Sequence, residues 1–314
     1  MPTKPACDLT FEATDDIASL TEKAKDVFID DIFRQQLPVP PYAPVMFAKV
    51  AKAKDGRVVG GVAGTSLWNC VEISHVAVHP DFRQRGVGTA LMKCIEEAAR
   101  GELACNQMRV QVLSWQPRHF FEKLGYKVQW KQENLPRGHA TYYLAKEWPM
   151  GFRDEPPQGY DAAATNLVVA EWDTKEATVQ LDEWIRADAE RHNLPDVYPR
   201  KEVTYGLKAL QSDGSLAALC MYKIYWNMLY VHILTVMKGR KRRGVGSAVL
   251  RKIDEIAREH ACDDVTLHTM SWQARPFYEK KNGFVCAATE NDLPFTFCRY
   301  DMYHPVPRVV RSNL

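Results

Sequence analysis

Apolar residues recur at helical spacing in two segments that each begin at a glycine. The first segment runs from Gly86 to about Arg100, and the second runs from Gly244 to about His260. The apolar positions are Val87, Ala90, Leu91, Cys94, Ile95, Ala98 and Ala99 in the first, and Val245, Ala248, Val249, Ile253, Ile256 and Ala257 in the second. An apolar stripe along one face is typical of a helix that packs on a core. Each segment therefore predicts an amphipathic helix.

Runs rich in β-branched and aromatic residues surround both segments and predict strands. They span 8–13, 46–53, 57–69, 71–79, 107–114, 127–130 and 140–148 in the first half, and 166–172, 205–211, 216–226 and 228–236 in the second. Another helix follows the first strand of each half, from Thr14 to about Gln36 and from Thr174 to about His192. The proline-bearing segments 37–44 and 193–200 come next and are expected to be loops.

The two halves are copies of each other. Residues 83–100 read RQRGVGTALMKCIEEAAR and residues 241–258 read KRRGVGSAVLRKIDEIAR, with nine of eighteen positions identical. A second match, SWQPRHFFEKLGY against SWQARPFYEKKNGF, follows in the same order. A period of 158 residues is too long for a solenoid and predicts a duplicated domain. We therefore expect domains at 1–150 and 165–314, joined by a Pro-, Gly-, Asp- and Ala-rich linker at 151–164.

Composition narrows the function classes. With 46% hydrophobic and 25% charged residues, the 314-residue chain has the balance of a globular protein. A net charge of +2 gives no overall field that would favour nucleic acid or membrane, so the cluster KGRKRR at 238–243 acts locally if it acts at all. The eight cysteines form no C-x-x-C pair and no zinc-like spacing, which predicts reduced thiols and no metal site. Without a signal peptide or a long apolar run, a cytoplasmic protein is expected.

A glycine turn opens each amphipathic helix. In VAVHPDFRQRGVGTAL a strand ends near Val78, Pro80 turns the chain, and Gly86-x-Gly88 begins the helix. The turn is not a P-loop, which would need the pattern G-x-x-x-x-G-K-[ST]. It is not a dinucleotide fingerprint either, because Leu91 and its counterpart Val249 stand where a third glycine is required. Glycines let the backbone approach an anion, and the first-turn N–H groups and the helix dipole favour negative charge. This pattern predicts a pyrophosphate site; the alternative is a glycine-eased helix start beside surface arginines.

These residues resemble a known family. V-A-V-x-P-x-x-R-x-x-G-x-G is similar to motif A of the Gcn5-related N-acetyltransferases (GNAT), and F-Y-E-K-x-x-G-F is similar to their motif B. The resemblance covers about 8–148 and 166–305 and implies two α/β domains, each a twisted mixed sheet with helices on both faces. It also implies acetyl-CoA as cofactor, with the pantetheine arm paired along the motif A strand. A backbone N–H near Val76 or Leu234 would polarise the thioester.

The resemblance supplies the expected cofactor-binding residues of both copies. In the first copy they are Val76, Val78, Arg83, Gln84, Arg85, Gly86, Val87, Gly88 and Thr89. In the second copy they are Leu234, Val236, Lys241, Arg242, Arg243, Gly244, Val245, Gly246 and Ser247.

Each copy has only one of the two proton-transfer residues that many members of the family use. Many members carry a base fourteen residues before the first glycine, where this chain has Glu72 in the first copy and Tyr230, a poor base, in the second. Many use the tyrosine of motif B as the acid for the leaving thiolate; here it is Tyr278 in the second copy and Phe121 in the first. Alternatively, Glu72 is a surface carboxylate and Tyr278 a packed aromatic. His75, His232 and His268 are expected to be packed or solvated, although His232 is placed to replace the missing base.

The prediction is an N-acetyltransferase that moves an acetyl group directly to a primary amine of a small molecule or protein in a ternary complex. Tyr278 favours the second copy as catalytic, because a missing base is replaced by water more readily than a missing acid. A tandem CoA-binding module without catalysis is the alternative. Nucleic-acid binding through KGRKRR is disfavoured, because the first copy's HPDFRQR is less basic.

Overall fold

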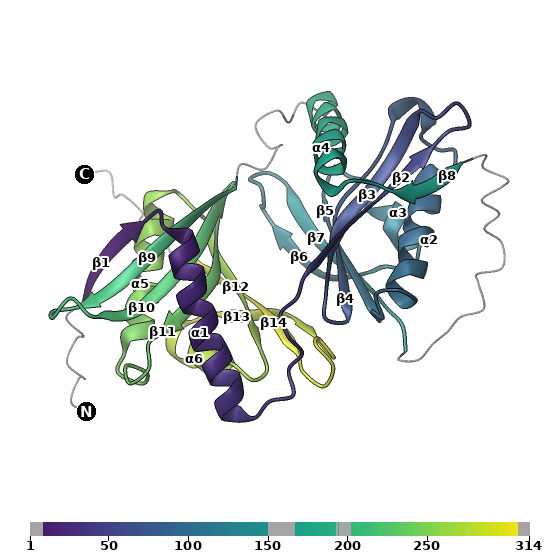
Figure 1. The fold of residues 1–314 in the computed structure, drawn as a ribbon. Coiled ribbons are helices and arrows are strands. Elements are labelled where there is room, and N and C mark those ends of the chain that lie inside the picture. The colour runs from purple at the N-terminus through teal and green to yellow at the C-terminus, as the bar shows by residue number, and fades with distance from the viewer. Residues whose placement is uncertain (1–8, 150–166, 193, 195–201, 307–314) are drawn as a thin grey trace, which may run out of the picture. The chain divides into compact units, whose positions relative to one another are not determined.

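The computed structural model describes residues 9–149, 167–192, 194 and 202–306, which form two compact units (Figure 1). The α2 unit comprises Pro40–Pro199 and Leu293–Phe295, and the α5 unit comprises Met1–Val39, Arg200–Asp292 and Thr296–Leu314. Each unit has one mixed sheet with helices on both faces, which confirms the predicted α/β class. None of the helices in the described ranges is long and apolar enough to cross a membrane.

The sheet of the α2 unit has the strand order β6-β7-β5-β4-β3-β2-β8. Its elements are β2 (Val45–Lys52), β3 (Val58–Leu67), β4 (Cys70–Val78), the 3-10 helix η1 (Pro80–Phe82), α2 (Val87–Arg100), β5 (Gln107–Leu113), α3 (Arg118–Lys123), β6 (Lys127–Glu133), β7 (Ala140–Glu147), β8 (Val168–Glu171) and α4 (Thr174–Arg191). The predicted stripe of α2, including Leu91 and Ile95, packs with Val62. Leu181 of α4 packs with Ala63. Because adjacent strand residues point to opposite faces, α2 and α4 cover different faces of the sheet.

The α5 unit repeats this arrangement with the order β1-β9-β10-β11-β12-β14-β13. Its elements are β1 (Leu9–Thr14), α1 (Ile17–Gln35), β9 (Val203–Gln211), β10 (Leu216–Tyr225), β11 (Met228–Val236), α5 (Val245–Glu259), β12 (Asp264–Met270), α6 (Arg275–Asn282), β13 (Val285–Glu290) and β14 (Arg299–Pro305). Ile253 of α5 packs with Cys220 on one face of the sheet. Leu20 of α1 packs with Leu219 on the other face.

The opening strand and helix of each half belong to the sheet of the other half. β8 pairs antiparallel with β2, from Lys49↔Glu171 to Lys52↔Val168. β1 pairs antiparallel with β9, from Leu9↔Gln211 to Thr14↔Gly206. The domains 1–150 and 165–314 predicted from the repeat are therefore not the compact units of the structure. The predicted linker 151–164 lies outside the described residues.

This correction has a simple physical reason. An apolar stripe requires that a helix cover a sheet, but it does not say which of two similar sheets is covered. The repeat duplicates both the covering helices and the sheets, so either pairing satisfies the same hydrophobic pattern. The choice depends on contacts between residues that are far apart in the sequence.

Candidate active sites

The central parallel strands separate in each sheet. β4 and β5 pair from Cys70↔Gln107 to Ile73↔Val110, and β11 and β12 pair from Met228↔Asp264 to Val231↔Leu267. Each first strand continues beyond the last parallel pair, to Val78 or Val236. In each sheet a register shift also interrupts the ladder to the preceding strand near this point, and such bulges bend and twist a strand. The separation thus begins a few residues before the predicted positions, and it leaves one strand edge open for an extended ligand.

A turn of the same shape follows this edge in both units. Gln84 and Gly86 have φ of 60° and 81°, and Arg242 and Gly244 have φ of 63° and 85°. Glycine suits the last position because the left-handed region strains residues that carry a Cβ. The first intrahelical bonds run from the N–H of Ala90 to Gly86 and from that of Ala248 to Gly244 (2.9 and 3.0 Å).

The helix starts leave backbone donors available to a ligand. The N–H groups of residues 87–89 and 245–247 precede the first intrahelical donors, Ala90 and Ala248, and lack partners inside their helices. The positive end of the helix dipole adds to them. A turn with two left-handed residues and a helix start without a side-chain cap is a type of structure that can bind phosphate groups. The pyrophosphate site stays a prediction.

The second glycine of each turn has a packing role that the sequence did not reveal. A Cβ on Gly88 would lie 3.2 Å from Cζ of Phe120, and a Cβ on Gly246 would lie 3.0 Å from Cζ of Phe277. The same Cβ on Gly246 would lie 3.6 Å from a methyl group of Val236. Because this glycine has no side chain, the turn can pack closely against the open strand edge and against the motif B helix, which is α3 in the α2 unit and α6 in the α5 unit.

The basic residues near the turns differ in their hydrogen bonds and in their exposure to solvent. Arg83 donates from Nε to the carbonyl of Val78 (3.1 Å) and from Nη1 to Asp188 of α4 (2.8 Å). Arg240 donates to Gln211 and Ser215 at the β9–β10 turn (3.0 and 3.3 Å), so its side chain stabilises the fold. The side chains of the remaining basic residues of the second turn, Lys241, Arg242 and Arg243, are exposed.

Tyr278 lies on α6 in the same apolar cluster as Leu234 and Val236 of the open strand. Its ring meets Phe277 and Phe284 edge-on, with centroids 5.0 and 5.7 Å apart. Burial raises the pKa of Tyr278, so the phenol stays protonated at neutral pH. Within the described parts of the chain, no residue forms a hydrogen bond with its hydroxyl. The ring of Tyr278 is packed, its hydroxyl keeps its proton, and its role as the acid stays a prediction.

Phe121 occupies the equivalent position in the α2 unit. It meets Phe120 and Tyr126 edge-on, with centroids 5.0 and 5.8 Å apart. The two environments match closely, and the difference between the positions is one hydroxyl group. The α2 unit therefore has no phenol at this position, and the assignment of the acid to the second copy stays a prediction.

Glu72 is exposed on β4. Its neighbours Val71 and Ile73 face α2, so Glu72 faces the side that α4 covers. Further along that strand, His75 contacts the hydroxyl of Ser74 through Nδ1 (2.9 Å) and Asp182 of α4 through Nε2 (3.2 Å). His75 is therefore fixed to a helix that belongs, by sequence, to the other half.

Tyr230 contacts His268, which the sequence analysis expected to be only packed or solvated. Its hydroxyl lies 2.5 Å from Nδ1 of His268 on the neighbouring strand. His232, the alternative considered as a replacement for the base, has its ring centroid 6.1 Å from that of Tyr230. Partial desolvation, with Lys223 nearby, lowers the pKa of His232. Alignment of the two copies could have drawn attention to His268, because Gln111 stands at its position in the first copy.

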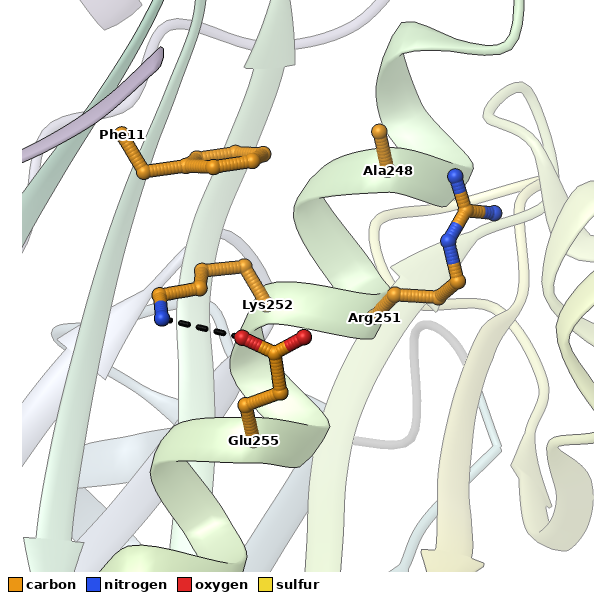
Figure 2. A pocket seen from close by; sticks show the side chains of 5 residues that line it. All are labelled: Phe11, Ala248, Arg251, Lys252 and Glu255. Atoms are coloured by element: carbon orange, nitrogen blue, oxygen red, sulfur yellow. Dashed lines mark hydrogen bonds and ion pairs between the residues drawn. The ribbon is translucent and has the colours of Figure 1, made fainter. Parts of the chain in front are cut away.

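A groove beside α5 is separate from these features. It is lined by Phe11, Ala248, Arg251, Lys252 and Glu255. Figure 2 shows Arg251 and the Lys252–Glu255 ion pair (2.9 Å) on α5, with the ring of Phe11 nearby. It includes none of the residues predicted to bind the cofactor or to act in catalysis.

Comparison with known proteins assigns both halves to one family. The sequence model of the Acetyltransferase (GNAT) family matches residues 14–126 and again 162–284. The chain belongs to this family and carries its domain twice. The chain is therefore an N-acetyltransferase by class.

Three relatives illustrate the match, and each aligns with less than half of this chain. A blasticidin-S acetyltransferase from Streptomyces morookaense is 26% identical over 114 residues, which are 36% of this chain and 84% of the relative. An uncharacterized N-acetyltransferase from Methanocaldococcus jannaschii is 36% identical over 75 residues, which are 23% and 48% of the two chains. A solved acetyltransferase structure from Bacillus cereus is 24% identical with a TM-score of 0.38, covering 44% of this chain and 96% of that one.

Proposed function

We propose that the protein transfers an acetyl group from acetyl-CoA to a primary amine of a small molecule or a protein, directly in a ternary complex, and that the α5 unit is catalytic. The observation that carries this proposal is the position of Tyr278. Its protonated hydroxyl lies in one apolar cluster with the open strand edge, next to a turn that fits a diphosphate.

The chain's own groups suit each part of this cofactor. The N–H groups of residues 245–247, with Lys241, Arg242 and Arg243, would bind the phosphates, and the backbone of Leu234–Val236 would pair with the pantetheine arm. Acetyl-CoA, when bound, supplies the acetyl group as a thioester. The N–H near Leu234 would polarise its carbonyl oxygen, and Tyr278 Oη holds a proton for the leaving sulfur.

The α2 unit has the same turn and open edge without the phenol. Residues 83–89 and Val76–Val78 would bind a second cofactor molecule, and Glu72 would be the available base. Phe121 cannot donate a proton, and Asp188 already engages Arg83. The missing phenol favours a role in cofactor binding or acceptor positioning for this unit, and Asp188 competes with the cofactor for Arg83.

Calorimetric titration with acetyl-CoA, followed by thiol-release assays with a panel of amines, tests the proposal. We expect two binding sites per chain and transfer to at least one class of amine. Binding without transfer to any amine or hydrolysis would instead support the tandem CoA-binding module. Absence of binding would contradict both functions.

Replacing Asp188 by asparagine should tighten acetyl-CoA binding to the α2 unit. The Arg83–Asp188 pair is partly exposed, and such pairs contribute about 0.5–1 kcal/mol, so release of Arg83 should raise affinity about two- to fivefold. Calorimetry on the two-site protein would measure the change. Asp81→Asn is the matched control, because it removes an exposed charge near the same turn without contacting Arg83. Equal effects of the two changes would contradict the prediction.

A further inference from the structure

Tyr230 and His268 meet where the central strands of the α5 unit separate. Tyr230 pairs with Thr266 in the parallel β11–β12 ladder, and the last pair is Val231↔Leu267. His268 is therefore the first residue of β12 beyond the ladder. The Tyr230 hydroxyl lies 2.5 Å from Nδ1 of His268, and the two rings are stacked with centroids 5.9 Å apart.

The α2 unit has a different pair at the same positions. Glu72 stands at the position of Tyr230, and Gln111 stands at the position of His268. A carboxylate can accept a proton unaided, whereas a phenol cannot do so at neutral pH unless it passes its own proton to another group. In the α5 unit an imidazole contacts the phenol, and imidazole is the side chain best suited to accept a proton near pH 7.

We propose that Tyr230 and His268 form the proton-accepting pair of the α5 unit, an inference that rests on the proposed acetyl transfer. The acceptor's nitrogen lone pair forms the bond to the acetyl carbon, and the electron pair of the broken C–S bond goes to sulfur. Tyr230 Oη takes the proton from the nitrogen as its own proton passes to His268 Nδ1. Tyr278 Oη supplies the proton that sulfur takes. His268 then returns its proton to solvent, and Tyr278 regains one from solvent.

The neighbouring charges favour this assignment. Asp301 lies directly opposite His268 in the β12–β14 ladder, where a negative charge would stabilise an imidazolium. Arg299 pairs with both Asp301 (3.0 Å) and Glu290 (3.4 Å), so one cation is shared by two carboxylates and this group keeps one net negative charge. Lys223 lies opposite Tyr230 in the β10–β11 ladder, but an ion pair with Glu202 balances its charge. The proton-accepting pair therefore has a counter-charge beside the imidazole.

Substitutions at Tyr230 and His268 test the proposal, and two of them introduce the residue that the α2 unit has at the same position. Tyr230→Phe and His268→Gln should each lower kcat about 10- to 100-fold, and the double variant should lose little more, because both residues serve one proton transfer. Tyr230→Glu installs the carboxylate of the α2 unit and should stay within about threefold of the wild type. His232→Gln should retain kcat. Wild-type kcat in His268→Gln, or a loss confined to His232→Gln, would overturn the proposal.

A second measurement does not depend on activity. Imidazole nitrogen NMR of the cofactor-free protein should show His268 with an unprotonated Nδ1 that accepts a hydrogen bond, and Tyr230→Phe should shift that signal. A proton on Nδ1 of neutral His268 would overturn the proposal. If the wild type transfers no acetyl group, the proposed function fails, whereas normal transfer by His268→Gln contradicts the proton-accepting pair alone.

Discussion

Replacing Tyr278 by phenylalanine should lower acetyl transfer about 10²–10³-fold and leave the affinity for acetyl-CoA nearly unchanged. General acids typically contribute this much, because the leaving group departs more easily when it takes a proton. The ring should stay in place, since its packing involves Phe277 and Phe284 rather than the hydroxyl. Because burial raises the pKa of Tyr278, the phenol should stay protonated, and active as an acid, to a higher pH than an ordinary tyrosine.

Steady-state kinetics, calorimetry and thermal unfolding of the variant would check this expectation. Tyr126→Phe in the α2 unit is the matched control, because Tyr126 also lies edge-on to a neighbouring aromatic ring and its hydroxyl contacts Met108 (3.8 Å). That change should alter turnover by less than about twofold. A Tyr278→Phe enzyme with wild-type turnover would show that sulfur leaves unassisted, and it would remove the reason for placing catalysis in the α5 unit.

The elements of each site that come from one continuous stretch could be predicted from the sequence. The turns at Gly86 and Gly244 and the equivalence of Phe121 with Tyr278 follow from two short motifs, and the structure gives them matching shapes. Local backbone conformation and helix packing decide these features, and both depend on nearby residues. The family match follows the same continuous halves.

The contacts between distant elements could not be predicted in the same way. Tyr230 and His268 are 38 residues apart, and their contact depends on the register of two parallel strands. The pairing of Arg83 with Asp188 joins residues 105 apart and depends on which sheet α4 covers. Apolar periodicity shows which face of a helix is buried but not which sheet it covers. The exchange of β1 and α1 with β8 and α4 therefore cannot be seen in the hydrophobic pattern.

The exchange predicts that fragments 1–150 and 165–314 do not fold when produced alone. The first fragment would lack β8 and α4, which leaves one edge of its sheet open at β2 and exposes Ala48, Ala63 and Ala77. The second would lack β1 and α1, which opens the edge at β9 and exposes Leu219 and Met221. Open strand edges and bare apolar faces promote aggregation, so each fragment should be insoluble or lack a cooperative thermal transition.

Produced together, the fragments should assemble, because each supplies a strand and a helix that the other requires. A chain cut by a protease site placed within 151–164 should likewise keep its two parts together through purification and unfold with the uncut protein's transition. Circular dichroism and co-purification with a tag on one part would measure both effects. Association alone does not separate exchange from simple contact between finished domains, so the isolated fragments decide the matter. A fragment that is monomeric and unfolds cooperatively by itself would mean that its own opening strand and helix complete its sheet, which contradicts the exchange.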